Sequence, residues 1–150
     1  MRKGVLLVWA VAAACASGEK TSADTAVAAD SISDRLVDYY TGVWDVEVRP
    51  EGSDSVVTIY TLNTTDNREW YFAAPDQKPV TLRVKSTRGD TVYTETGTFT
   101  SAIKPGVQAT ATSRAWFDED DRLVGVMLIS FETGGPDSVV TYNTYGRRKQ

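Results

Sequence analysis

The side chains that could do chemistry in this chain are mostly carboxylates and hydroxyls, because its 150 residues include 20 Asp and Glu, no histidine and one cysteine. Zinc sites, haem sites and Cys- or His-based nucleophilic sites therefore lack their usual residues. General acid–base catalysis needs two groups held close together with separated pKa values, and no pair of acids stands out. We predict no catalytic residue, no cofactor and no metal site. An enzyme that works through a carboxylate pair or a Ser–Lys dyad is the least favoured alternative.

The densest group of acids is Asp118-Glu119-Asp120-Asp121. Hard cations such as Ca²⁺ prefer oxygen ligands of this kind. However, Arg122 and Leu123 resume a strand pattern at once, whereas an EF-hand loop needs alternating acids, a central glycine and a distal glutamate. The spacing therefore predicts an exposed charged hairpin, with weak calcium binding as the alternative.

The single cysteine, Cys15, follows an N-terminal segment that begins with Arg2 and Lys3 and continues as an apolar run over 5–14. This run is shorter than the roughly 20 residues that a helix needs to span a bilayer. A basic start, a short apolar run and small residues before a cleavage site are typical of a secretory signal.

The segment Val11-Ala12-Ala13-Ala14-Cys15 resembles the lipobox of bacterial lipoproteins. The resemblance implies that residues 1–14 are a signal peptide and that Cys15 becomes lipidated, which anchors the protein to a membrane of the bacterial cell envelope. Ala16, where an inner-membrane retention signal would place Asp, favours the outer membrane. The alternative is a plain secretory signal cleaved near Ala14, with Cys15 as an incidental thiol.

Charge argues against a nucleic acid partner. The signal carries two of the 16 basic residues, so 14 remain against 20 acidic ones, a net charge of −6. Phosphate binding needs Lys and Arg clustered on one face, and the only dense basic cluster is Arg147-Arg148-Lys149 at the chain end.

The residues after Cys15 change character twice. Residues 15–30 contain too little apolar surface to offset the entropy of ordering them, which predicts a flexible tether. Ser31 and Asp34 have the spacing of a capping box. The apolar residues that follow share one helical face, which predicts a short helix that ends before Gly42; they are Ile32, Leu36, Val37 and Tyr40.

From Gly42 onward, β-branched and aromatic residues alternate with regular turn signals, which predicts antiparallel strands. Seven turns divide this region into eight strands near 42–49, 55–63, 68–73, 80–86, 91–100, 107–117, 122–132 and 137–147. Short turns make each strand pair with its sequence neighbour. Closure into a small up-and-down β-barrel removes the two exposed edges, so we predict an all-β domain over 31–150.

Alternation along the strands predicts which side chains face inward. In the first strand Trp44, Val46 and Val48 share one face. The strand over 122–132 is different, because Val124, Val126 and Leu128 make its second face apolar as well. We expect a helix or a partner to cover that face, and the short N-terminal helix is the nearest candidate.

The triplet Gly42-Val43-Trp44, which opens the first of eight meander strands after a short helix, resembles the G-x-W pattern of lipocalins and the wider calycins. The resemblance covers about Ile32 to Arg148 and implies structural roles for Gly42 and Trp44. It also implies that Arg147 or Arg148 packs on Trp44 as a cation on an aromatic ring. The chain is similar to small bacterial lipoproteins with a lipocalin-like domain, although it has no disulfide and no long first loop.

This resemblance implies a non-enzymatic binder of a small hydrophobic or amphipathic ligand inside the barrel. The candidate ligand-binding residues are Trp70, Phe72, Tyr93, Glu95, Phe99 and Trp116. The alternative is a filled barrel that acts as an interaction or scaffold domain for another envelope protein. A cavity of several hundred Å³ would favour the binder, and a packed interior would favour the scaffold.

Glu95 has two possible environments. If the face it shares with Tyr93 and Phe99 points inward, the buried carboxylate needs Arg83, Arg114 or a hydroxyl as its partner. If that face points outward, Glu95 lies on a solvated strand surface, which is the favoured arrangement.

Overall fold

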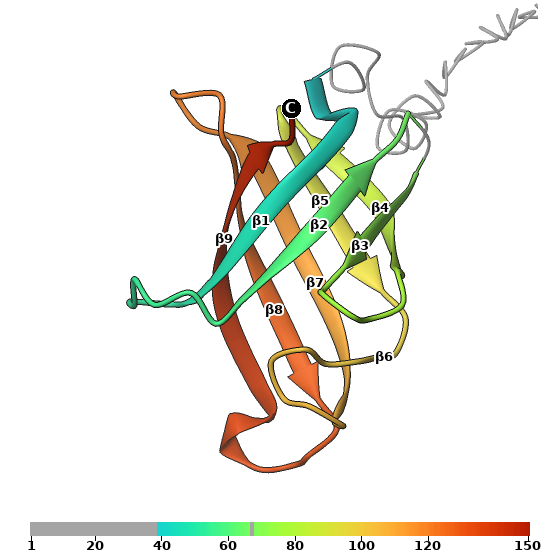
Figure 1. Ribbon diagram of the computed structural model, residues 1–150, viewed down its shortest axis with the longest axis vertical. Coiled ribbons are helices and arrows are strands. Elements are labelled where there is room, and N and C mark those ends of the chain that lie inside the picture. Colours follow the sequence, from blue (N-terminus) through green and yellow to red (C-terminus); the bar gives the residue numbers. More distant parts are fainter. Residues whose placement is uncertain (1–38, 67) are drawn as a thin grey trace, which may run out of the picture.

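The computed structural model describes residues 39–66 and 68–150, which form a closed antiparallel β-barrel (Figure 1). Around the wall the strands follow the order β1-β2-β3-β4-β5-β7-β8-β9, and β9 pairs with β1. Pairing of β5 with β7 closes the wall, and β6 pairs only with β7. The elements are β1 (Gly42–Pro50), β2 (Thr58–Thr64), β3 (Glu69–Ala73), β4 (Val80–Arg88), β5 (Thr91–Thr96), β6 (Phe99–Thr100), β7 (Gln108–Phe117), β8 (Leu123–Phe131), the 3₁₀ turn η1 (Pro136–Ser138) and β9 (Val139–Arg148).

The prediction of an all-β, closed eight-stranded antiparallel barrel is confirmed. No helix of seven or more residues occurs in the described ranges. The helix expected from Ser31 onward lies outside them except for its last two positions, Tyr39 and Tyr40, which are helical. The expected signal over 1–14, the anchor at Cys15 and the tether over 15–30 also lie outside the described residues.

The one strand that differs from expectation is the fifth, expected over 91–100. Glu95 of β5 pairs with Thr112 of β7, but Phe99 of β6 pairs with Ala109 of β7. The chain therefore advances four residues from Glu95 to Phe99 while β7 advances three. The extra residue makes a bulge at Gly97 and Thr98, which breaks the strand in two. Because the side-chain period of a strand is two, the bulge reverses the face of every residue after it.

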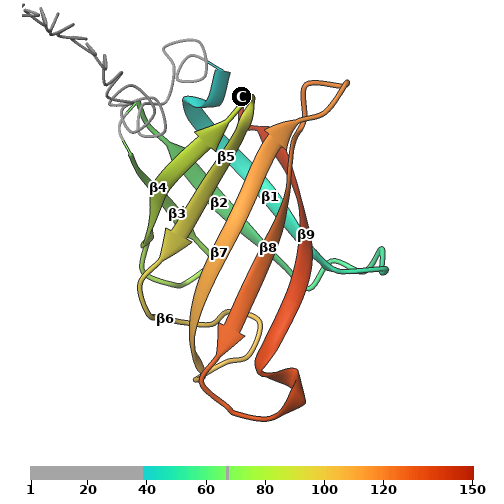
Figure 2. The same cartoon turned by 180° about the vertical axis from the view of Figure 1, so that it is seen from behind.

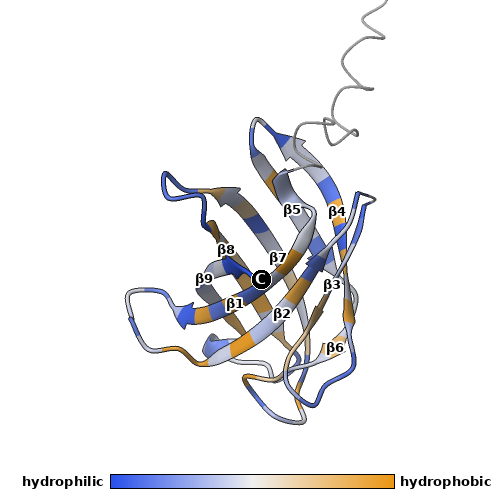
Figure 3. Cartoon of the chain, turned by 45° about the horizontal axis from the view of Figure 1, so that its top comes forward, coloured by the Kyte–Doolittle hydropathy of each residue, from blue (hydrophilic) through white to orange (hydrophobic). Residues whose placement is uncertain are grey.

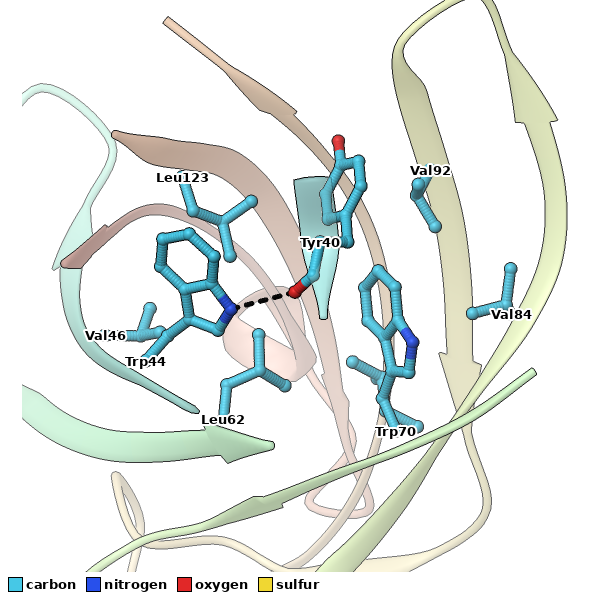
Figure 4. Packing of buried hydrophobic residues seen from close by; sticks show 9 residues of the cluster. Tyr40, Trp44, Val46, Leu62, Trp70, Val84, Val92 and Leu123 are labelled. Atoms are coloured by element: carbon cyan, nitrogen blue, oxygen red, sulfur yellow. Dashed lines mark hydrogen bonds between the residues drawn. The ribbon is translucent and has the colours of Figure 1, made fainter. Parts of the chain in front are cut away.

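Apolar and polar side chains alternate along the barrel wall (Figure 3). In β1, Trp44, Val46 and Val48 are buried, while Asp45 and Glu47 between them are partly accessible. The upper half of the interior, nearest the C-terminus, is filled by one apolar cluster (Figure 4). Its buried members are Tyr40, Trp44, Val46, Leu62, Trp70, Leu82, Val84, Val92 and Leu123.

Hydrogen bonds fix the large rings of this upper cluster. Trp44 donates from Nε1 to the carbonyl oxygen of Tyr40 at 3.1 Å (Figure 4), and the hydroxyl of Thr64 donates to the same carbonyl. The Tyr40 ring stacks on Trp70 at 5.4 Å between ring centroids. The Tyr40 hydroxyl lies 2.8 Å from the carbonyl oxygen of Asp90 and 2.9 Å from that of Ala115. The buried polar groups of this end are therefore paired.

Arg148, rather than Arg147, closes the upper end. Its guanidinium carbon lies 4.5 Å from the centroid of the Trp44 ring. Nη1 donates to the carbonyl oxygen of Thr41 at 2.9 Å, and Nη2 donates to that of Tyr39 at 2.8 Å. Gly42 beneath it has φ +152°, and a Cβ there would lie 3.0 Å from Nη1 of Arg148. A residue without a side chain is needed at this position for both reasons.

Candidate ligand-binding site

The lower half of the barrel has a second apolar cluster, in which two alanines stand beside larger residues; its buried members are Val48, Ala109, Ala111, Ile129, Phe131 and Tyr142. Because alanines take the places that large rings occupy in the upper half, a cavity of about 40 Å³ remains here. A void of about 20 Å³ lies between the two halves, beside Tyr60 and Trp70. One water needs roughly 10–15 Å³ by this measure, so the cavity has room for about three waters. The interior is close to filled, far below the several hundred Å³ that would favour a binder, so volume alone favours the filled-barrel alternative.

The segment between β6 and β7 folds across the lower end of the barrel (Figure 1). We call residues 101–107 the cover. Ser101 is buried, and its Oγ accepts hydrogen bonds from the backbone N–H of Ile103 at 3.1 Å and of Lys104 at 3.0 Å. Lys104 Nζ lies 4.2 Å from the centroid of the Phe131 ring and donates to the carbonyl oxygen of Asp137 at 3.1 Å. The side chains of Ala102 and Ile103 thereby form part of the cavity wall.

A surface groove of about 500 Å³ lies beside the cavity, between residues 77–81 and 97–100. The groove exists because β4 begins at Val80, whereas its pairing with β5 begins two residues later, at Leu82. Leu82 pairs with Thr96, which is the last residue of β5. The bulge at Gly97 and Thr98 then carries the chain away from β4. Gln77 and Phe99 line both the groove and the cavity, so these two side chains separate the interior from solvent.

Among the residues that the structure describes, none that lines the cavity is charged. Ser113 at its wall is 2.6 Å from the Thr94 hydroxyl and so is already paired. The Tyr60 hydroxyl forms no hydrogen bond with a described residue, and burial raises the pKa of Tyr60 above its ordinary value. The hydroxyl therefore stays protonated and can donate a hydrogen bond. An uncharged, mainly apolar molecule with one acceptor atom matches this lining.

Three of the predicted ligand-binding residues face the interior. Phe72 and Phe99 line the cavity, and their rings meet edge to face at 5.4 Å between centroids. The Tyr60 ring lies 5.3 Å from Phe72 on its other side. Trp70 belongs to the upper cluster, where its Nε1 donates to the carbonyl oxygen of Thr65 at 3.2 Å. The structure therefore brings Phe72 and Phe99 together and places Trp70 above them.

The other three predicted residues do not face the interior. Tyr93 and Glu95 point outward, because the bulge at Gly97 reverses the face between them and Phe99. Glu95 pairs with Lys85 at 3.0 Å between Oε1 and Nζ, as the outward arrangement requires. Trp116 alternates with the inward-facing Ala115 and Phe117 and also lies outside. Tyr93 and Trp116 therefore do not line the interior, and Glu95 has the outward position that the sequence favoured.

Sequence analysis did not single out Tyr60, Gln77 or the cover. Alternation in the second strand could have identified Tyr60, because it lies two residues before the buried Leu62. The cover had only a turn signal at Lys104-Pro105-Gly106, which does not reveal that the loop folds inward over Phe131.

In the acidic hairpin, the Asp118 carboxylate is bonded to other residues of the same hairpin. The Asp118 carboxylate accepts hydrogen bonds from the Arg122 side chain at 2.8 Å and from the backbone N–H groups of Arg122 and Asp120 at 3.0 Å each. The side-chain hydrogen bond from Arg122 is the main cause that holds the pKa of Asp118 below its ordinary value. In residues 39–66 and 68–150, no group of three or more potential ligands is placed to hold a metal ion.

Neither the protein-family models nor the curated proteins with which the sequence was compared give a match. The fold is compatible with a lipocalin-like barrel, since eight antiparallel strands close in sequence order. In the described part of the chain, no helix has both the length and the apolar composition needed to cross a bilayer.

Proposed function

We propose that this protein is a non-enzymatic binding module for a small, uncharged and mainly apolar molecule, which it takes up in the lower half of a lipocalin-like barrel. The observation that carries the proposal is the shared wall of the cavity and the groove. Only Gln77 and Phe99 line both spaces, so an apolar interior lies directly behind a solvent-filled groove.

Binding requires a rearrangement, because ligand pockets usually measure about 300–1,000 Å³ and the cavity measures about 40 Å³. Phe99 is half-buried and belongs to the short strand β6, which pairs on one side only. The neighbouring cover is held on the barrel by the Lys104 side chain and by packing of Ile103 and Val107 on the lower cluster. Rotation of Phe99 together with an outward shift of Ile103 would join the cavity to the groove.

The Tyr60 hydroxyl supplies the polar contact in this proposal. Tyr60 is half-buried, and its hydroxyl forms no hydrogen bond with a described residue, so it can donate to an acceptor atom of a ligand. An anion would instead lose its hydration without meeting a cation, because the cavity wall carries none. The ligand is therefore a neutral molecule such as an alcohol, ketone or ester.

We further propose that the barrel is held at the bacterial cell envelope, most simply at the outer membrane, by lipid on Cys15. Residues 1–14 resemble a lipoprotein signal, and residues 15–30 have the composition of a tether. In a membrane fractionation, Cys15→Ser should move the protein to the soluble fraction, and retention in the membrane would contradict this anchor.

The first test is titration of hexan-1-ol into the full chain carrying Cys15→Ser, followed by ¹H–¹⁵N NMR. The amides of Tyr60, Phe72 and Ile103 should shift together, and Tyr60→Phe should weaken binding by about threefold to tenfold through the lost hydrogen bond. Tyr71→Phe removes an exposed hydroxyl and is the matched control. Absence of shifts at the cavity residues would contradict the proposal.

A second candidate function is an interaction domain that presents its outer face to another envelope protein. It is favoured by the outer face of β8, where Leu128 is 41% exposed and Val124 and Val126 are only partly covered. A photo-crosslinking residue at Leu128 should then yield one discrete protein adduct in intact envelopes. The same residue at Thr81, in the groove, is the control.

A further inference from the structure

A second hollow, separate from the proposed interior site, lies on the outer surface of the barrel across β4, β5, β7 and β8. These are the strands that face the viewer in Figure 2, where β4 and β5 lie beside β7 and β8. The hollow measures about 480 Å³. That volume lies within the range of small-molecule pockets.

The floor of the hollow is apolar. Val126 and Leu128 come from the outer face of β8, and the Tyr93 ring comes from β5. Register places them together, because Arg114 of β7 pairs with Val126 on one side and with Tyr93 on the other. Sequence analysis singled out two of these residues. Leu128 lies on the second apolar face of the strand expected over 122–132, and Tyr93 was a candidate ligand-binding residue.

A bulge in β4 supplies part of the rim. Val84 pairs with Thr94 and Ser86 with Tyr93, so Lys85 between them is the extra residue. Its ammonium group points to the outer face and forms the 3.0 Å ion pair with Glu95. The charges of Lys85 and Glu95 therefore offset each other at the edge of the hollow.

The third charge of the hollow has no counterion. Arg114 forms no ion pair with a described residue, and its guanidinium carbon lies 5.9 Å from the centroid of the Trp116 ring. This cation lies beside an apolar floor. Its charge is opposite in sign to the formal net charge of the chain, which is −4. A guanidinium pairs well with a carboxylate, because two of its N–H groups match the two oxygens.

We propose that this outer hollow binds a small amphipathic carboxylate, whose apolar chain lies on Tyr93, Val126 and Leu128 and whose anionic group pairs with Arg114. The site is independent of the interior cavity and differs from it in chemistry. The cavity has no charged side chain and selects neutral molecules, whereas the hollow has one uncompensated positive charge and selects anions.

The test compares decanoate with decan-1-ol as ligands of the full chain carrying Cys15→Ser, so that no detergent competes. By ¹H–¹⁵N NMR, decanoate should shift the amides of Tyr93, Arg114 and Leu128 and bind about fivefold or more tightly than decan-1-ol at this site. Arg114→Gln should abolish that preference, and Arg114→Lys should keep a part of it. Arg147→Gln removes an equal charge at the far end of β9 and should change nothing.

Three results would overturn the proposal. They are equal affinity for decanoate and decan-1-ol at the outer residues, unchanged decanoate binding in Arg114→Gln, and decanoate shifts confined to cavity residues such as Phe72 and Ile103. Because the two sites report through different amides, failure here leaves the proposed function untouched, and failure of hexan-1-ol binding at Tyr60 leaves this proposal untouched.

Discussion

The two halves of the barrel interior are built from the same eight strands but differ in how completely they are filled. The upper half contains Trp44, Trp70 and Tyr40, and their polar atoms are hydrogen-bonded. The lower half contains alanines, a cavity of about 40 Å³ and a Tyr60 hydroxyl that forms no hydrogen bond with a described residue. A filled, fully bonded half resists change, whereas an underfilled half can take up a ligand at small cost. The upper half therefore contributes most to stability, and the binding that we propose is assigned to the opposite end.

The largest expected effect comes from the upper half. Trp44→Ala removes a side chain that is 2% exposed, together with the hydrogen bond to Tyr40 and the ring beneath Arg148. We expect a loss of about 3–5 kcal/mol in the free energy of unfolding, measured by urea denaturation. An unchanged denaturation midpoint would mean that the upper half does not hold the fold together.

Phe99→Ala tests the lower half in the same way. Phe99 is only half-buried, so we expect a smaller loss, about 2 kcal/mol, by the same measurement. Because the ring separates the cavity from the groove, its removal should also speed the association of hexan-1-ol. A loss as large as that of Trp44→Ala would erase the contrast between the halves.

Arg148→Met tests the closure of the upper end. The substitution keeps much of the apolar stem but removes two hydrogen bonds to backbone carbonyls and the cation over Trp44. We expect a loss of about 1–2 kcal/mol. Arg147→Met, one position earlier, is the control and should stay within about 0.5 kcal/mol of the parent.

The two tyrosine hydroxyls give the sharpest comparison. Tyr40→Phe removes a hydroxyl that reaches two carbonyl oxygens and should cost about 1 kcal/mol. Tyr60→Phe removes a hydroxyl with no partner among the described residues and should leave the free energy of unfolding within about 0.5 kcal/mol or raise it. Equal losses in the two variants would show that the Tyr60 hydroxyl is paired after all.

The smallest effect is expected at the cover. Lys104→Met removes the ammonium group from the Phe131 ring and from the Asp137 carbonyl, where the hydrogen bond is exposed to solvent, so stability should fall by less than about 0.5 kcal/mol. Hydrogen exchange in 101–107 should nevertheless become faster, because the cover loses a tie to η1. Slow, unchanged exchange would indicate that the cover is held by its backbone bonds and Ser101 alone.

Most of the strand pattern could be predicted from the sequence, because turn residues and a period of two are local signals. The predicted range 80–86 lies within β4, and 42–49 lies within β1. The error over 91–100 arose from Gly97, where alternation alone cannot show whether the strand continues or bulges. That single extra residue moved Tyr93 and Glu95 outside while Phe99 stayed inside.

The amino-acid sequence by itself determined the all-β class, the number of strands in the wall and the burial of Trp44, since each depends on residues close together in the chain. It also excluded histidine chemistry by composition. Only the tertiary structure decided that Arg148 rather than Arg147 covers Trp44, that the cover folds under the barrel, and that Arg114 lies between Tyr93 and Val126 without a counterion. Each of these features depends on residues that are distant in the sequence. Where such residues meet is set by the strand register, by one bulge and by how the side chains of several strands pack together.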